Sequence, residues 1–593
     1  MNVTTGVETE HEEGPSRAEP LVPGVALARR YRRAWLRHDV VAGLVLTALL
    51  VPQGMAYAEL AGLPAVTGLY ATLVPLLAYA LVGPSRILVL GPDSALAPIV
   101  AAAVVPLAVS PDERVALAGL LALMVGVLLL AGGIARLGFL TDLLSRPVRI
   151  GYLGGIAVIV VINQAPELLG FSVPDGDVFD DVTGLVEGLD DVDATTAVIG
   201  IACLAVILGL RRFAPIVPGV LIAVVGATAL VGIFDLPVDV VGEVPSGLPS
   251  PTIPSPSVED LGRLTFSALA IALLAFADTS VLSRSYASRL GERVDQSREL
   301  AALGVANVAT GFMQGFPISS SSSRTPVAEA AGARTQLTGV VAALLLAAVL
   351  VAGTGMLADI PQTALAAVVI AAVTRLVDLP ALRRLFDVHR ADFALAVASF
   401  LGVVVFGILP GVGIAIGLSV LAVLERAWHP YTAVLGRVRG LKGYHDVVRH
   451  PEGRQVPGLL LFRFDAPLFF ANAEVFRDGI HRALAAADGP VRVVVVAAEP
   501  ITEVDSTAAE VLAELNGELE RMDIDLGFAE MKGPVKDRLR RYGLFERIGE
   551  ERFYPTIGLA VRSYVVEHDV AWQDWEEEER EETGSVSTRR GPP

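Results

Sequence analysis

Long apolar stretches alternate with short polar segments over the first two thirds of the chain. Between Val40 and Trp428 these stretches approach the roughly 17–25 apolar residues that cross the hydrocarbon core of a bilayer, and charged residues cluster between them. Clear spans are predicted at about residues 39–57, 66–82, 115–135, 148–168, 194–211, 216–234, 264–283, 297–313, 334–356, 361–378, 391–408 and 411–428. Two further stretches, about 93–108 and 320–331, are short and are interrupted by Pro, Gly or Ser. The pattern predicts a polytopic α-helical membrane protein with 14 transmembrane elements.

The pattern changes after Arg437, where polar and apolar residues mix as they do in a soluble globular domain. Strands are predicted over 459–464, 491–497 and 524–528, and amphipathic helices over 473–487 and 506–522. Strands that alternate with helices predict a layered α/β domain. The chain is therefore divided into a cytoplasmic N-terminal tail (1–34), a transmembrane domain (35–430), an α/β domain (440–568) and an acidic tail predicted to be disordered (569–593).

Arginine placement predicts the orientation of the spans. Arg29, Arg30, Arg32, Arg33 and Arg37 precede the first span, which predicts a cytoplasmic N-terminus. The long segments 171–193 and 235–262 then lie outside, and neither contains Lys or Arg. An even number of crossings follows, so the α/β domain is expected in the cytoplasm, beneath a cell inner (plasma) membrane.

Composition argues against several kinds of functional site. The net charge of −18 comes largely from loops and tails, and such acidic runs are usually solvated. The single cysteine, Cys203, allows neither an intrachain disulfide nor a cysteine-based metal site, and the eight histidines show no metal-ligand spacing. No segment resembles a nucleotide-binding P-loop. We therefore expect no metal, no cofactor, no nucleic-acid partner and no enzymatic activity.

The two short elements occupy corresponding places, third and tenth, in the two halves of the transmembrane domain. Interrupted spans at matching positions are a sequence indication of a transporter's binding site at the membrane midplane. Because seven spans is an odd number, two such halves would insert with opposite orientation, as inverted repeats. A helix that begins in mid-membrane leaves its first N–H groups unpaired, and an anion would satisfy them. The alternative interpretation is two short helices in a packed bundle.

Candidate binding residues follow from this arrangement. The first short element opens with Asp93-Ser94, and the second opens with five serines that lead into Arg324. The first span adds Leu49, Gln53 and Tyr57, which the i, i+4, i+8 spacing places on one helix face. Taken alone, Gln53 and Tyr57 are equally consistent with contacts between helices.

These segments resemble the sulfate permease (SulP) family of anion transporters. The resemblance is strongest in Val51 to Ala58, Gly68-Leu69-Tyr70, Gly83 to Arg86, Gly91-Pro92 and Phe316 to Arg324, and it covers about residues 35–565. It implies seven-plus-seven inverted repeats, divided into core and gate domains that move as an elevator. It also implies an anion site made of Leu49, Gln53, Tyr57, Asp93, Ser94, Ser321, Ser322, Ser323 and Arg324. Position 93 departs from the motor-protein members of the superfamily, which carry an aromatic residue there.

Two acids suggest coupling to a cation. Asp93 is expected beside the anion, and Asp278 lies deep in the eighth span, where an ionised acid costs at least about 2.5–3.5 kcal/mol. A carboxylate would repel an anion unless it were protonated or paired. Proton-coupled uptake through Asp93 or Asp278 is the hypothesis we favour, but Asp93 could act as a helix cap, and Arg324 could neutralise either acid. Sodium is the competing cation, with Thr279 as a further ligand, although Leu282 stands where a sodium-coupled bicarbonate branch has Thr.

The C-terminal domain resembles the STAS domain of the same family, through Asp465 to Ala473 and Val504 to Thr507. Thr507 corresponds to a position that is phosphorylated in related regulators, although capping of the following helix explains this segment as well. The resemblance also implies a homodimer. We expect a secondary transporter of sulfate, bicarbonate or dicarboxylates in a lipid bilayer. The alternatives are sodium-coupled symport, an uncoupled exchanger or channel and, less favoured, a nucleobase permease.

Overall fold

The computed structural model describes residues 31–138, 145–173, 178–214, 217–254, 257–291, 294–321 and 323–572, with a few isolated positions nearer the ends. The chain separates into two compact units, residues 1–420 and 421–593. We describe each unit by itself.

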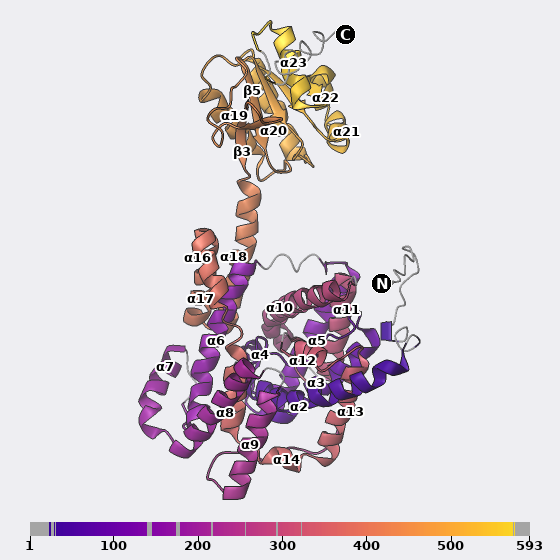
Figure 1. Ribbon diagram of the computed structural model, residues 1–593, viewed down its shortest axis with the longest axis vertical. Coiled ribbons are helices and arrows are strands. Elements are labelled where there is room, and N and C mark those ends of the chain that lie inside the picture. Colours follow the sequence, from indigo (N-terminus) through magenta and orange to yellow (C-terminus); the bar gives the residue numbers. More distant parts are fainter. Residues whose placement is uncertain are drawn as a thin grey trace, which may run out of the picture. The chain divides into compact units, whose positions relative to one another are not determined.

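The first unit is helical (Figure 1). The helices of its first half are α2 (Leu36–Leu60), α3 (Ala65–Val82), α4 (Ala97–Val104), α5 (Pro111–Ile134), α6 (Arg146–Leu169), α7 (Val178–Glu187), α8 (Ala194–Phe213) and α9 (Gly219–Phe234). Those of the second half are α10 (Val258–Leu290), α11 (Gln296–Phe312), α12 (Arg324–Ala330), α13 (Leu337–Ala352), α14 (Gly355–Ala358), α15 (Gln362–Val373), α16 (Leu379–Val388), α17 (Arg390–Phe406) and α18 (Ile408–Trp428). Each predicted span thus coincides with a helix.

The predicted boundaries fail in three places. Helix α4 begins at Ala97 rather than near residue 93, because residues 90–91 form a strand and a turn follows. Helix α10 extends well beyond 264–283 at both ends, with a capping box in which Ser257 and Asp260 bond reciprocally. Helix α7 forms in segment 171–193, which the sequence predicted only as a loop.

Several helices are long and apolar enough to cross a membrane. By length and composition, 7 helices within the described ranges meet this condition, and α4, α9, α13 and α15 belong to a further set of shorter apolar helices. In α18 only 22% of the most apolar window is buried within the protein. Apolar surface of this kind is stable against lipid and costly against water.

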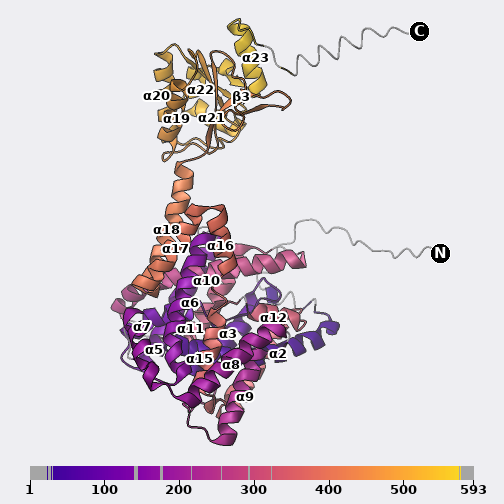
Figure 2. The ribbon, with the colours of Figure 1, turned by 60° about the vertical axis from the view of Figure 1, so that its left-hand side comes forward.

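The two halves pack reciprocally. The second element of each half packs on the fourth element of the other, α3 on α13 and α11 on α5 (Figure 1). Likewise the fifth element of each half packs on the sixth of the other, α6 on α17 and α15 on α8 (Figure 2). Such reciprocity is the property of two halves related by a two-fold axis. The fold is therefore that of inverted repeats, as predicted.

Small residues allow the close approach of α5 and α11. A Cβ atom on Gly311 would lie 2.6 Å from the carbonyl oxygen of Gly119, and one on Gly304 would lie 2.9 Å from that of Gly126. Glycine at such positions brings two helix backbones into contact, which is how helices associate where no hydrophobic effect drives them together. This contact fixes the middle of the core.

The second unit is the predicted α/β domain. Its sheet has the order β4-β3-β5-β6-β7-β8, with β5 (Leu459–Phe464), β6 (Val493–Ala497), β7 (Asp525–Ala529) and β8 (Phe553–Tyr554) parallel. Strands β3 (Thr432–Arg437) and β4 (Tyr444–Asp446) form an antiparallel edge. The helices are α19 (Ala473–Ala485), α20 (Ser506–Glu520), α21 (Gly533–Arg541), α22 (Leu544–Ile548) and α23 (Ile557–Glu567). Because β3 belongs to this sheet, the domain begins before the predicted residue 440.

Candidate functional site

The helices of the first unit form two groups that border one cavity. We call α2, α3, α4, α5, α10, α11, α12 and α13 the core group, and α6, α8, α9, α15 and α17 the gate group, because the helices of each pack mainly on one another. The cavity between the groups has a volume of about 450 Å³ and takes its lining from both. That volume is within the range of small-molecule sites.

The core wall of the cavity is polar and contains two acids. We define it by residues from α2, the turn before α4, α10 and the segment before α12: Leu49, Gln53, Tyr57, Asp93, Ser94, Asp278, Ser320, Ser321 and Ser323. Seven of the sequence-predicted binding residues are thus brought together here, with Asp278 of the predicted coupling residues. Ser322 lies outside the described residues.

Two short strands hold the interrupted elements side by side. Strand β1 (Leu90–Gly91) pairs antiparallel with β2 (Ser319–Ser320), with Leu90 opposite Ser320. Equivalent strands that pair antiparallel lie across the axis that relates the two halves. The pairing brings Asp93 and the serines, far apart in sequence, to one wall.

Asp93 lines the cavity, and its carboxylate also bonds within the turn that precedes α4. Its carboxylate accepts a hydrogen bond from Ala95 N at 2.9 Å, and its carbonyl oxygen accepts from Leu96 N and Ala97 N. We expected the first N–H groups of this helix to be free for an anion, and these three are not. The carboxylate of Asp93 satisfies one of them, and its backbone carbonyl oxygen satisfies the other two.

The serines are also partly engaged with one another. The hydroxyls of Ser321 and Ser323 lie 2.9 Å apart, and Ser320 N donates to Oγ1 of Thr279 at 3.3 Å. Thr279 is fully buried behind the strand and does not line the cavity. By contrast, the buried Gln53 Oε1 and Ser320 Oγ have no hydrogen-bond partner in the described part of the chain, so they are available to a ligand.

Arg324 lies behind the core wall. Its side chain is 1% exposed, it is absent from the cavity lining, and its Nη2 donates to the carbonyl oxygen of Gly91 at 3.1 Å. Gly91 has a φ of +153°, and a Cβ atom there would lie 2.6 Å from Nη1 of Arg324. Glycine at this position lets the guanidinium approach the backbone closely. Arg324 therefore ties α12 to β1, and within the described residues it makes no ion pair with Asp93 or Asp278 of the kind that the sequence left open.

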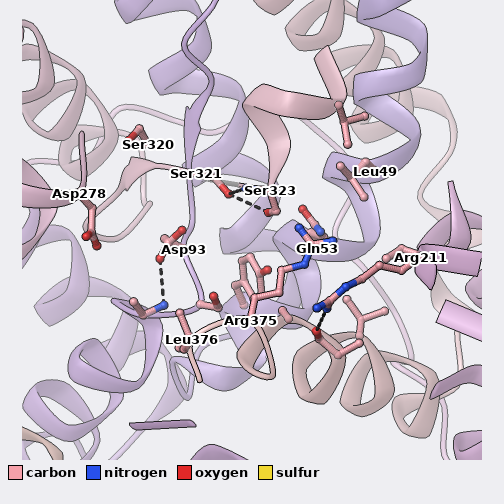
Figure 3. Close-up of a pocket in the computed structure, with 18 of the residues that line it drawn as sticks. Leu49, Gln53, Asp93, Arg211, Asp278, Ser320, Ser321, Ser323, Arg375 and Leu376 are labelled. Carbon is pink, nitrogen blue, oxygen red and sulfur yellow. Dashed lines mark hydrogen bonds between the residues drawn. The ribbon is translucent and has the colours of Figure 1, made fainter. Parts of the chain in front are cut away.

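The gate wall carries the positive charge of the cavity. We define it by four arginines, none of which the sequence analysis proposed as a site residue: Arg146 and Arg149 of α6, Arg211 of α8, and Arg375, which follows α15. Figure 3 shows Arg211 and Arg375 on one side of the cavity and Asp93 and Asp278 on the other. The sequence offered one indication of their role. All four lie near the end or the beginning of a span, from which a long side chain can reach a central cavity.

Among the described residues, one ion pair crosses the cavity. Arg149 Nη1 lies 3.8 Å from Asp278 Oδ1, and each side chain is 26% exposed. This pair links α6 of the gate group to α10 of the core group. Arg211 is held within its own group instead, because its Nη1 donates to Ala371 O and Thr374 Oγ1, both at 3.4 Å.

Two further features of the described residues bear on the sequence predictions. No cluster of three or more His, Cys, Asp or Glu side chains that could hold a metal ion occurs among them. In the α/β domain, the carboxylate of Asp505 caps α20 by accepting from Ala508 N at 2.8 Å. Thr507 is exposed in the first turn of that helix and is not its cap.

Comparison with known proteins identifies the chain. Residues 36–399 match the model of the sulfate permease family, and residues 450–560 match that of the STAS domain. A Mycobacterium tuberculosis protein named as a probable sulfate transporter is 44% identical over 91% of this chain and 98% of its own length. The chloroplastic sulfate transporter 4.1 of Arabidopsis thaliana is 31% identical over 92% of this chain and 82% of its own.

Solved structures share the fold. The overall structure of SLC26A9 has a TM-score of 0.85 at 22% identity, over 93% of each chain. The transmembrane domain of the cyanobacterial bicarbonate transporter BicA has a TM-score of 0.58 at 24% identity, over 66% of this chain and 98% of its own. The chain therefore belongs to the sulfate permease family and has a helical transmembrane domain followed by a C-terminal STAS domain, as the sequence motifs predicted.

Proposed function

We propose that the protein is a secondary active transporter that carries a small anion, with sulfate as the first candidate, in symport with a proton. The observation that carries this proposal is the cavity between the two groups of helices. Its core wall offers hydroxyls, an amide and two carboxylates, and its gate wall offers four arginines. Arginine forks match the oxygen atoms of sulfate, bicarbonate and carboxylates.

The choice of sulfate rests on the relatives. Relatives that match over most of both chains include proteins named as sulfate transporters in Mycobacterium tuberculosis and Arabidopsis thaliana. Bicarbonate and dicarboxylates carry the same kind of oxygen atoms and are the alternative substrates. The proposed substrate-binding residues are those predicted from the sequence, with Arg324 behind the wall rather than on it.

The acids favour a coupled cation. An anion that enters the cavity faces Asp93 and Asp278, and either carboxylate would repel it while ionised. A bound proton removes that repulsion. Sodium is the less favoured cation because the hydroxyl of Thr279 is turned to Ser320 N and away from the cavity.

Movement of the core group against the gate group would give the cavity access to each side in turn. The two groups meet mainly through α2, which packs on α9 and α15. An elevator movement of this kind needs few contacts to break. The binding residues on the core wall would move, and the arginines would stay.

The test is uptake of labelled sulfate into proteoliposomes under imposed gradients. We expect uptake to rise severalfold when the outside is made acidic, and to respond little to an inward sodium gradient. Uptake that is the same with and without the pH gradient would contradict proton coupling. Uptake that follows sodium alone would support the rival coupling. No uptake of sulfate, bicarbonate or succinate under any gradient would contradict the proposed transport function.

We also propose that the protein lies in the cell inner membrane, with its N-terminus and STAS domain in the cytoplasm, and that it forms a homodimer. In a Cys203→Ser background, Ser246→Cys lies in a predicted external segment and Ser506→Cys lies in the STAS domain. A membrane-impermeant maleimide should label only the first in intact cells. Labelling of the second before permeabilisation would contradict the orientation, and a monomer mass in nanodiscs would contradict the dimer.

A further inference from the structure

The ion pair between Arg149 and Asp278 joins the two walls of the cavity. The two side chains lie on opposite walls of the cavity, at 3.8 Å, and both are partly open to it. Helix α6 packs on α8, α15 and α17, and α10 packs on α4, α5 and α11. The pair therefore joins two groups of helices at a point where α6 and α10 have no extensive packing of their own.

Asp278 depends on this one cation. Its carboxylate accepts no hydrogen bond from any described residue, and 3.8 Å is too long for a hydrogen bond with Arg149. Asp39 shows the contrast. It lies in the first turn of α2, is fully buried, and accepts hydrogen bonds from Tyr31 OH and from groups near the start of α13: Arg334 N, Thr335 N and Oγ1, and Thr338 Oγ1. Asp39 is fixed in place, whereas the partner of Asp278 is exchangeable.

Arg149 is likewise held by a single charged contact among the described residues. Its only charged contact within the described residues is the one with Asp278, and its side chain faces the same cavity as Gln53 and Ser321. A long arginine side chain that holds one negatively charged group at ion-pair distance can reach another nearby. An anion in the cavity would be such a group.

We propose that Arg149 is shared, so that it pairs with Asp278 while the cavity is empty and with the transported anion while the cavity is loaded. This inference rests on the proposed anion transport and deepens it. Binding of the anion removes the cation from Asp278. The carboxylate left behind then attracts a replacement positive charge, and a proton is the replacement that the proposed function supplies.

The same exchange would couple binding to movement. While the pair is intact it links the gate group to the core group across the cavity. An anion that takes Arg149 opens this link, so the loaded cavity has one less attraction between the two groups. Anion binding and release of the link are then one event.

The experiment is a double-mutant cycle on the full-length protein in detergent, with labelled sulfate as the probe. Asp278→Asn frees Arg149, so we expect sulfate to bind about tenfold more tightly. Arg149→Gln should weaken binding by about tenfold. In the double variant, the gain from Asp278→Asn should shrink to less than about twofold, because no arginine is released.

Arg146→Gln is the matched control. Arg146 lies on the same helix and lines the same cavity, but no ion pair joins it to Asp278 among the described residues. The tenfold gain from Asp278→Asn should persist in this background. If Arg149→Gln fails to fold, Arg149→Lys replaces it, and the gain should then survive at least in part because the charge remains.

The outcomes separate this inference from the proposed function. Asp278→Asn could tighten sulfate binding equally in the presence and absence of Arg149. Asp278 would then act only by repelling the anion. That result overturns the sharing of Arg149 and leaves the proposed transport function standing. No gain from Asp278→Asn overturns the sharing as well. If the unmodified protein neither binds nor transports sulfate, bicarbonate or succinate, the proposed function fails, and the inference fails with it.

Discussion

The core wall of the cavity combines hydroxyls, an amide and two carboxylates, several of them bonded within the wall itself, whereas the gate wall carries four arginines. Asp93 caps a turn, and Ser321 and Ser323 bond one another. Arg149 and Arg375 reach the cavity with at most one ion pair between them among the described residues. The difference teaches that the core wall gives the site its shape, and the gate wall gives it its positive charge.

This division has a physical reason. A site that must release its ligand on both sides of the membrane cannot bind it with every group at once. In the movement that we propose, groups fixed on the core wall stay with the ligand. Charges on the gate wall attract it over a longer range and lose contact with it when the two walls move apart.

The largest effect is expected from the buried arginine behind the core wall. Arg324→Gln removes the donor to Gly91 O and loosens the link between α12 and β1. We expect the free energy of unfolding to fall by about 2 kcal/mol and uptake to fall more than about tenfold. Thermal unfolding in detergent and proteoliposome uptake measure the two. Normal stability with lost uptake would instead indicate that Arg324 contacts the anion directly.

Asp93→Asn tests the acid of the core wall with the shape preserved. Asparagine can accept the hydrogen bond from Ala95 N as aspartate does, so we expect normal folding. Uptake should still respond to the pH gradient, because Asp278 remains to take up the proton, and KM for the anion should fall about fivefold because one repelling carboxylate is neutral. Loss of the response to the gradient would assign the coupled proton to Asp93 and contradict the role inferred for Asp278.

Arg375→Gln tests the gate wall. Because Arg375 lines the cavity without an ion pair among the described residues, its removal should leave thermal stability unchanged. We expect KM for the anion to rise about fivefold while kcat stays close to normal, which is the signature of lost binding alone. The contribution should also weaken as ionic strength increases. A fall in kcat with constant KM would place Arg375 in the movement rather than in binding.

The smallest effect is expected from Arg211→Gln. Its guanidinium already donates to Ala371 O and Thr374 Oγ1 within the gate group, so less of its charge is offered to the cavity. We expect KM to rise only about twofold. An effect as large as that of Arg375→Gln would mean that the four arginines attract the anion through their summed charge. The hydrogen bonds of Arg211 within the gate group would then make no difference to binding.

The sequence predicted the elements of this protein well because those elements depend on local pattern. Apolar length predicted the spans, and alternation of strands and helices predicted β5, β6, α19 and α20 close to their observed bounds. The start of α4 was missed because a strand pair with a distant segment replaced its first turn. Strand β3 was missed because it follows a span closely, and its place between β4 and β5 depends on pairing with other segments rather than on its local pattern.

The candidate site was predicted in part for the same reason. Gln53, Tyr57, Asp93 and the serines were recognisable from motifs and helix spacing, and the structure places them around one cavity. The direction of Arg324 was not predictable, since its partner Gly91 is 233 residues away. Nor was the gate wall, because an arginine at the end of a span has the same local pattern whether it faces headgroups or a cavity.

The sequence by itself determined a membrane protein of the sulfate permease family, its two domains and most of the residues of one wall of its cavity. Those follow from hydrophobic length, periodicity and motifs, which are properties of neighbouring residues. Only the tertiary structure decided which charges meet, since the pairs Arg149–Asp278 and Arg324–Gly91 join segments that no local pattern relates. The chemistry of the site lies in those long-range contacts, because a charge acts on whatever the fold brings within a few ångströms of it.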